Sequence, residues 1–256
     1  MRCQGTQFTK EGELQKMGYH SIIYIFLFLP VCLFVYQLAP EKWRGRVLLG
    51  FSWIFFYLLS GKLLVYLLGT TLLTHCVGIW LTVIRMQEAK AVEGLERKQK
   101  KAVKMEYQKK GRRVLALGIF ILLGILGYLK YFDFFTVNLS HLFGHPVLEG
   151  WRPENLLMPI GISFYTLQAI GYVYWGTIQA ETEIWRTALF LGFFPQIMEG
   201  PIARYSDVAD TLYTGKPLEY RNVVDGYVRI FWGLFKKMVI ADRMALMVNQ
   251  VFDHYA

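Results

Sequence analysis

Six polar side chains within two apolar segments of residues 156–205, which a short polar link separates, are the residues best placed for chemistry or ligand binding. They are Ser163, Tyr165, Gln168, Gln196, Glu199 and Arg204. Burying a hydroxyl, amide, carboxylate or guanidinium group without a partner costs several kcal/mol. We therefore expect these groups to face the backbone, one another or a hydrophilic cavity rather than lipid tails.

The same stretch contains residues that interrupt helices, among them Pro159, Gly161, Pro195, Gly200 and Pro201. A broken helix leaves backbone groups that need new partners, and within a membrane this is tolerated only where protein or water surrounds the break. One interpretation is therefore the wall of an internal tunnel. The other is a pair of proline-kinked spanning helices joined by ordinary hydrogen bonds.

A polar stripe follows if residues 160–174 are helical. Gly161, Tyr165, Gln168 and Tyr172 then recur at intervals of three and four residues on one face. Such a stripe can line a tunnel or form a contact between helices, and the sequence leaves both open.

The composition predicts an all-α, polytopic membrane protein, and the interrupted stretch adds kinked or re-entrant helices, with a central tunnel as one of the two interpretations above. Hydrophobic residues make up 54% of the chain, and several runs approach the roughly 20 apolar residues that span a bilayer. Residues 1–18 form a polar N-terminal segment, and a first span is expected over residues 19–38. Residues 47–84 are too long for one crossing, and Gly61 marks the expected break between two helices.

A further span is expected over residues 114–135. Gly118, Gly124 and Gly127 would permit close contact with another helix there. Near the end of this span Lys130 can pair with Asp133, three residues on, or extend its amine to the membrane surface.

The formal net charge of +9 arises largely from residues 85–113, which hold eleven Lys or Arg and four Glu. The positive-inside rule places this basic segment in the cytoplasm, either as a loop or as a solvated helix. Membrane orientation explains the charge without a nucleic-acid partner. An acidic partner or anionic lipid is the other interpretation of the segment.

The residues show no recognisable catalytic or metal-binding pattern. His141 and His145 are four apart, but Gly144 and Pro146 disfavour the helix that would bring them together, so no metal site is expected. His75, alone in an apolar run, is interpreted as a hydrogen-bonded packing residue. On residue types alone, the chain fits a transporter half or an intramembrane enzyme equally well.

Five segments resemble hallmarks of the membrane-bound O-acyltransferase family, in the branch typified by the alginate O-acetylation protein. They extend over nearly the whole chain and occur in the order found in the family. The segments are residues 26–30, 127–135, 159–168, 193–205 and 233–242.

This resemblance implies a helix bundle in the bacterial inner membrane that crosses it several times and encloses a tunnel. It implies transfer of an acyl group, usually acetyl, from a cytoplasmic thioester donor such as acetyl-coenzyme A or an acyl carrier protein. The acceptor would be a hydroxyl of an extracytoplasmic polysaccharide or a relay partner. No bound cofactor is implied. D-alanyl transfer to teichoic acid is a close alternative, and a transporter or flippase half is one of another class.

Two departures from the family are visible. The chain has about half the expected length, and the family histidine that would act as general base is expected beyond Ala256. Residues 172–179 also lack the acidic and basic residues of the family element at that place. Residues 19–256 are therefore expected to form the N-terminal half of an acyltransferase domain that is inactive alone, with no catalytic residue assigned.

Overall fold

The computed structural model describes residues 19, 21–93, 96–143, 159–175, 182–198 and 200–253, and these are helical or irregular, without a β-strand. The all-α fold predicted from the sequence is confirmed. The chain divides into two compact units, Lys42–Gly215 and the pair of segments Met1–Glu41 and Lys216–Ala256. The predicted N-terminal segment, residues 1–18, lies outside the described residues.

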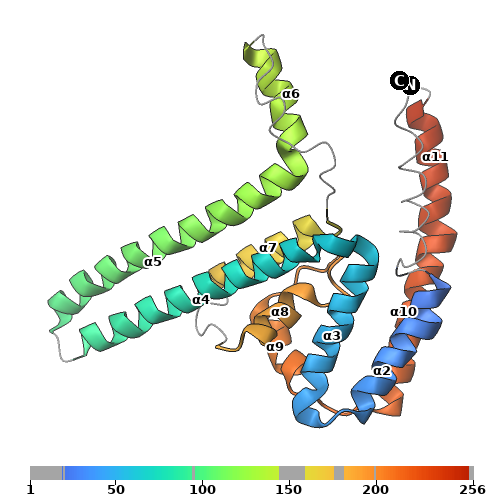
Figure 1. Ribbon diagram of the computed structural model, residues 1–256, viewed down its shortest axis with the longest axis horizontal. Helices are drawn as coiled ribbons and strands as arrows, with labels where there is room; N and C mark the ends of the chain where they lie inside the picture. The colour runs from blue at the N-terminus through green and yellow to red at the C-terminus, as the bar shows by residue number, and fades with distance from the viewer. Residues whose placement is uncertain are drawn as a thin grey trace. The chain divides into compact units, whose positions relative to one another are not determined.

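Three long helices frame the larger unit: α3 (Glu41–Ser60), α4 (Leu64–Val92) and α5 (Arg97–Leu126). A 3₁₀ turn at Gly61–Leu63 separates α3 from α4, and Gly61 adopts a φ of 54° that favours glycine. The predicted break is therefore confirmed. Figure 1 shows α4 and α5 side by side, with α7 (Ile162–Trp175) along them.

Two helical stretches, Glu41–Val92 and Lys98–Tyr131, are long and apolar enough to cross a membrane. Large apolar side chains such as Val65, Trp80 and Phe120 are more than half exposed on them, as expected of surfaces that meet lipid. The basic segment at residues 85–113 is mostly the end of α4 and the first half of α5. It is therefore helical rather than an extended loop.

A π-helical stretch, Gly127–Tyr131, joins α5 to α6 (Phe132–Phe143). The glycines expected to permit close helix contact behave differently. A Cβ atom on Gly118 would lie 2.9 Å from Cγ1 of Val77 on α4, whereas one on Gly124 or Gly127 would meet nothing within 4 Å. The expectation is correct for Gly118 and wrong for the other two within the described residues.

Short helices fill the interior of this unit: α8 (Ile184–Gly192) and α9 (Tyr205–Tyr213) join α7. Nine residues of α8 extend about 14 Å at 1.5 Å per residue, far less than the roughly 30 Å of a bilayer core. All residues of α8 from Thr187 to Gly192 are buried. The interpretation of this part as a kinked spanning helix is therefore wrong.

An aromatic cluster binds the short helices to one another. The rings of Tyr172 and Tyr205 meet edge to face with centroids 4.9 Å apart, and Phe190 and Tyr205 do so at 5.1 Å. Edge-to-face pairs add to the free energy of burial. Leu81 of α4 and Leu122 of α5 pack on the same cluster, so it joins five helices.

The smaller unit consists of a π-helical stretch (Tyr24–Phe28), α2 (Leu29–Leu38), α10 (Tyr220–Phe235), a second π-helical stretch (Lys236–Ala241) and α11 (Asp242–Asp253). The Tyr36 hydroxyl donates to the carbonyl of Lys216 at 3.0 Å. The N–H of Leu218 donates to Oε1 of Gln37 at 2.9 Å. These bonds hold the segment before α10 against the C-terminal end of α2. The expected first span, residues 19–38, ends at the same residue as α2.

The Gly118 contact generates a stability prediction. We expect Gly118→Leu to lower the thermal unfolding midpoint of the detergent-solubilised protein by several degrees, because overpacking costs about 1–3 kcal/mol and Val77 has little rotamer freedom in a helix. Gly124→Leu, on the same helix but facing open space, is the matched control. Equal midpoints for the two variants would show that this contact does not hold α4 and α5 together.

Candidate functional site: the broken-helix junction

The two interrupted segments predicted from the sequence meet in the larger unit. Gly161 has a φ of 73°, and a Cβ atom there would overlap the carbonyl oxygen of Ile197. Gly200 has a φ of 81°, and a Cβ atom there would lie 3.4 Å from the ring of Phe164. Both glycines thus permit a close approach between segments almost forty residues apart. We call this region, residues 159–168 and 190–200, the broken-helix junction.

Two side chains satisfy the backbone where α8 ends. In a continued helix the N–H of Phe194 would donate to the carbonyl of Phe190. Instead that N–H donates to Oγ of Ser52 at 3.2 Å, and the Phe190 carbonyl accepts from Nε2 of Gln168 at 2.7 Å. Ser52 in turn donates to the carbonyl of Leu48 at 2.7 Å. Side chains of α3 and α7 therefore close the end of α8.

A second serine of α3 serves the other break. The N–H of Ile160, just before α7, donates to Oγ of Ser60 at 3.2 Å. Ser52 and Ser60 are eight residues apart, so they lie on the same side of the helix. One face of α3 thus provides hydrogen-bond partners to both broken segments.

The interior also contains a buried histidine. His75 of α4 is 8% exposed, and its Nδ1 lies 3.2 Å from the hydroxyl of Thr187 on α8. The prediction that His75 is a hydrogen-bonded packing residue is confirmed. Thr71 and Thr74 bond their own helix, donating to the carbonyls four residues earlier.

The sequence did not predict the partner of Ser163. Nζ of Lys130, on the π-helical stretch after α5, donates to the Ser163 hydroxyl at 2.9 Å. The side chain of Asp133, the predicted partner of Lys130, lies outside the described residues. A bond between residues 33 apart in the chain leaves no periodic signal, so only the fold reveals it.

Two hydroxyls at the junction have no hydrogen-bond partner among the described residues. Tyr165 is 1% exposed, and its ring meets that of Phe56 at 6.4 Å, yet its hydroxyl is unpaired, as is that of Thr166. Leaving a buried donor unpaired costs about 1–3 kcal/mol. Among the described residues, these hydroxyls are buried polar atoms of the junction that are available to a bound group.

Three of the six predicted residues, Ser163, Tyr165 and Gln168, lie on α7. Ser163 and Gln168 have the hydrogen-bond partners described above, whereas the Tyr165 hydroxyl has none among the described residues. Gln196 is half-buried in the turn after α8, Arg204 is exposed at the residue before α9, and Glu199 lies outside the described residues. Tyr165, Gln168 and Tyr172 are all buried. Gln168 and Tyr172 contact other helices, Gln168 through the Phe190 carbonyl and Tyr172 through the aromatic cluster. The tunnel-lining role of the six residues stays a prediction.

The fold and the junction define a class: an all-α protein with membrane-length apolar helices and broken helices whose freed backbone groups are bonded by side chains. No protein-family model matches the chain, and no solved structure does so significantly. Curated proteins, however, do match it over most of its length.

The chain is 28% identical over 239 residues to the probable alginate O-acetylase AlgI of Pseudomonas aeruginosa, with 92% of this chain and 42% of that protein covered. The corresponding protein of Pseudomonas putida is 29% identical, with 92% and 45% covered. A peptidoglycan O-acetyltransferase of Helicobacter pylori is 27% identical over 276 residues, with 92% and 46% covered.

These comparisons confirm the resemblance to membrane-bound O-acyltransferases of the alginate O-acetylation branch. The names of these relatives, alginate O-acetylase and peptidoglycan O-acetyltransferase, are those of O-acetyltransferases, which is what this chain resembles. It spans less than half the length of the curated relatives it matches.

The Gly161 geometry leads to a first prediction for the junction. Gly161→Ala should lower the free energy of unfolding by at least about 2 kcal/mol. The alanine would have to adopt a left-handed φ, and its Cβ atom would overlap the carbonyl oxygen of Ile197. Gly171→Ala, on α7 with open space around its Cβ, should be neutral or stabilising by up to about 1 kcal/mol. Chemical unfolding followed by helical circular dichroism distinguishes them, and a tolerated Gly161→Ala would refute the close approach.

The cap on α8 gives a second prediction. Gln168→Leu keeps a side chain of similar size but leaves the Phe190 carbonyl unpaired, which should cost about 1–3 kcal/mol and lower the unfolding midpoint by several degrees. Gln196→Leu is the matched control, because no side-chain hydrogen bond of Gln196 is found within the described residues. Equal shifts for the two variants would contradict the capping role.

Proposed function

We propose that a protein containing this chain is a bacterial, inner-membrane, multi-pass O-acyltransferase. It transfers an acetyl group from a cytoplasmic thioester to a hydroxyl of an extracytoplasmic polysaccharide or of a relay partner. The observation that carries the proposal is the match over 92% of the chain to proteins named alginate O-acetylase and peptidoglycan O-acetyltransferase. The three relatives named above give no support to D-alanyl transfer or transport, the alternatives from the sequence.

The described structure supports the membrane setting of this proposal. Acyl transfer between two aqueous compartments needs a polar path through protein, and irregular backbone at membrane depth occurs where protein or water encloses it. The broken-helix junction has this character, since Ser52, Ser60 and Gln168 bond the freed backbone groups. The hydroxyl of Tyr165 has no partner among the described residues, and we assign it to bonding a polar atom of the substrate.

The chemistry itself needs a general base that takes the proton of the attacking hydroxyl. The resemblance implies a histidine for this step but assigns it to none of the histidines of this chain. His75, buried against Thr187, serves packing. The contribution of the described residues is therefore to build and brace the protein around the acyl-transfer path.

Ester-linked acetate on cell-envelope polysaccharide tests the proposal. We expect deletion of the gene to abolish acetate that mild base releases from alginate-like polysaccharide or from peptidoglycan, and a plasmid copy to restore it. The two polymers are purified separately and their acetyl signals measured by NMR, which identifies the acceptor. Unchanged acetate in both, together with altered uptake or export of a solute, would reject the acyltransferase and favour a transporter.

A further inference from the structure

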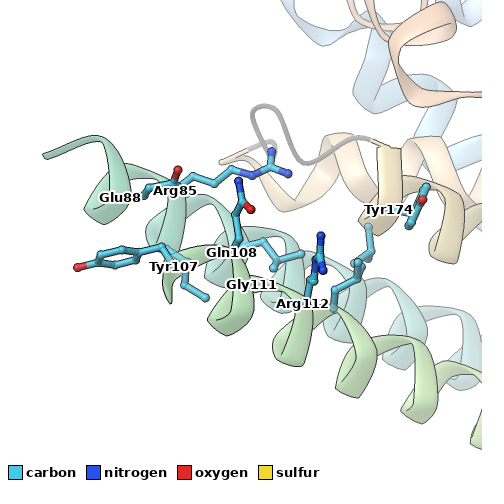
Figure 2. Close-up of a pocket in the computed structure, with 11 residues that line it drawn as sticks. Arg85, Glu88, Tyr107, Gln108, Gly111, Arg112 and Tyr174 are labelled. Carbon is cyan, nitrogen blue, oxygen red and sulfur yellow. The ribbon is translucent and has the colours of Figure 1, made fainter. Parts of the chain in front are cut away.

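A cavity away from the broken-helix junction lies where the apolar part of the α4–α5 pair gives way to its basic part. Its volume is about 190 Å³, several times the roughly 30 Å³ that one water molecule takes up in the liquid. Residues of α4, α5 and α7 line it. Figure 2 shows the labelled members Arg85, Glu88, Tyr107, Gln108, Gly111, Arg112 and Tyr174.

The mouth of this cavity is cationic. Arg85 comes from α4 and Arg112 from α5, and in Figure 2 their guanidinium groups point to the same side of the helix pair as the amide of Gln108. Glu88, three residues after Arg85, adds one carboxylate to the lining. Among the residues that line the cavity, two guanidinium groups and one carboxylate carry a net positive charge, and guanidinium N–H groups are hydrogen-bond donors.

The floor of the cavity is apolar. Leu81 and Ile84 of α4 and Val173 of α7 line it and are at most 8% exposed. Gly111 supplies no side chain, and a Cβ there would only touch Leu81 at 4.0 Å. A cationic mouth over an apolar floor fits a ligand that has an anionic head and a carbon-rich arm.

We propose that this cavity binds a phosphate ester, with Arg85 and Arg112 on the phosphate oxygens and the adjoining carbon chain against Leu81, Ile84 and Val173. Arginine is suited to this task because its planar fork donates two parallel hydrogen bonds to phosphate. Because both arginines lie on long continuous helices, their separation is fixed by helix packing rather than by a loop.

Two sources offer this chemistry at the boundary between apolar and basic helix. One is a thioester donor that carries phosphates beside an extended carbon arm, such as a coenzyme A derivative, and this source rests on the proposed function. The other is the headgroup of an anionic phospholipid, which basic segments at a membrane surface attract. Binding of a phosphate ester in this cavity does not depend on which of the two sources supplies it. The phosphate site and the acetyl-transfer proposal can therefore fail separately.

Binding experiments on the whole chain in nanodiscs separate these sources. The first arm titrates coenzyme A onto protein in phosphatidylcholine nanodiscs. The second measures, by mass spectrometry, the phosphatidylglycerol retained after detergent washing of protein from nanodiscs containing phosphatidylglycerol. The pocket variant is Arg85→Gln with Arg112→Gln. The matched control is Lys90→Gln with Arg113→Gln, which removes the same charge from the same two helices outside the cavity.

We expect the pocket variant to weaken binding at least about tenfold in one arm or both, relative to the control variant, because two charge-assisted contacts are lost. An effect on coenzyme A alone identifies a donor site, and an effect on phosphatidylglycerol alone identifies a lipid site. Both outcomes support phosphate-ester binding. Equal behaviour of the two variants in both arms overturns it.

A second variant guards against loss of fold. Gly111→Leu fills the cavity without changing charge, and leucine is a better helix former than glycine, so the protein should keep its helical circular dichroism and elution volume. It should weaken the same arm as the arginine pair. If Gly111→Leu folds and binds as the unchanged protein does, the cavity is not the binding site.

Discussion

A backbone N–H or C=O that loses its helical partner in a protein interior must find another, and this requirement organises the larger unit. The end of α8 shows it most directly, because the bond between Phe194 and Phe190 is replaced by one to Ser52 and one from Gln168. Each replacement comes from a different helix, so α3, α7 and α8 must hold a fixed register. A short helix whose last six residues are buried is possible here because neighbouring side chains bond the backbone groups at its C-terminal end.

The segments that resemble the acyltransferase family coincide with departures from regular α-helix. Residues 26–30 and 233–242 overlap the π-helical stretches of the smaller unit, and residues 127–135 overlap that of the larger one. The other two segments, residues 159–168 and 193–205, include most of the broken-helix junction. A π-turn or a break re-aims side chains, as Lys130 shows by reaching Ser163 from such a stretch. The resemblance therefore marks places where backbone geometry, rather than general hydrophobicity, constrains the residues.

Local patterns predicted much of the fold. Length and composition indicated an all-α chain with membrane-length helices, and Gly61 marked the break between α3 and α4 because glycine favours its left-handed φ. Proline and glycine indicated that residues 159–161 and 193–201 are irregular. They did not show that Gly161 packs on Ile197, since contact between distant segments depends on the whole fold.

Where prediction was wrong or incomplete, the cause was a distant partner or a missing neighbour. Gly124 and Gly127 have no close neighbour among the described residues. Figure 1 shows α5 diverging from α4 toward its C-terminal end, where these glycines lie. Gln168, a predicted tunnel-lining residue, donates to the Phe190 carbonyl, a partner that the sequence did not indicate, and its tunnel-lining role stays a prediction. The sequence shows that an amide is buried, and only the fold shows which backbone group it bonds.

The basic segment at residues 85–113 acquires a different meaning once its conformation is known. As a loop its charge would mainly set orientation in the membrane. As the continuation of two apolar helices, it carries guanidinium groups at fixed positions directly beside buried leucine, isoleucine and valine side chains. Gly111, which has no side chain, lines the cavity together with Leu81. Topogenic charge requires only the number of cations, whereas a phosphate site requires this placement, and that difference is why Arg85 and Arg112 are distinguished from the other cations of the segment.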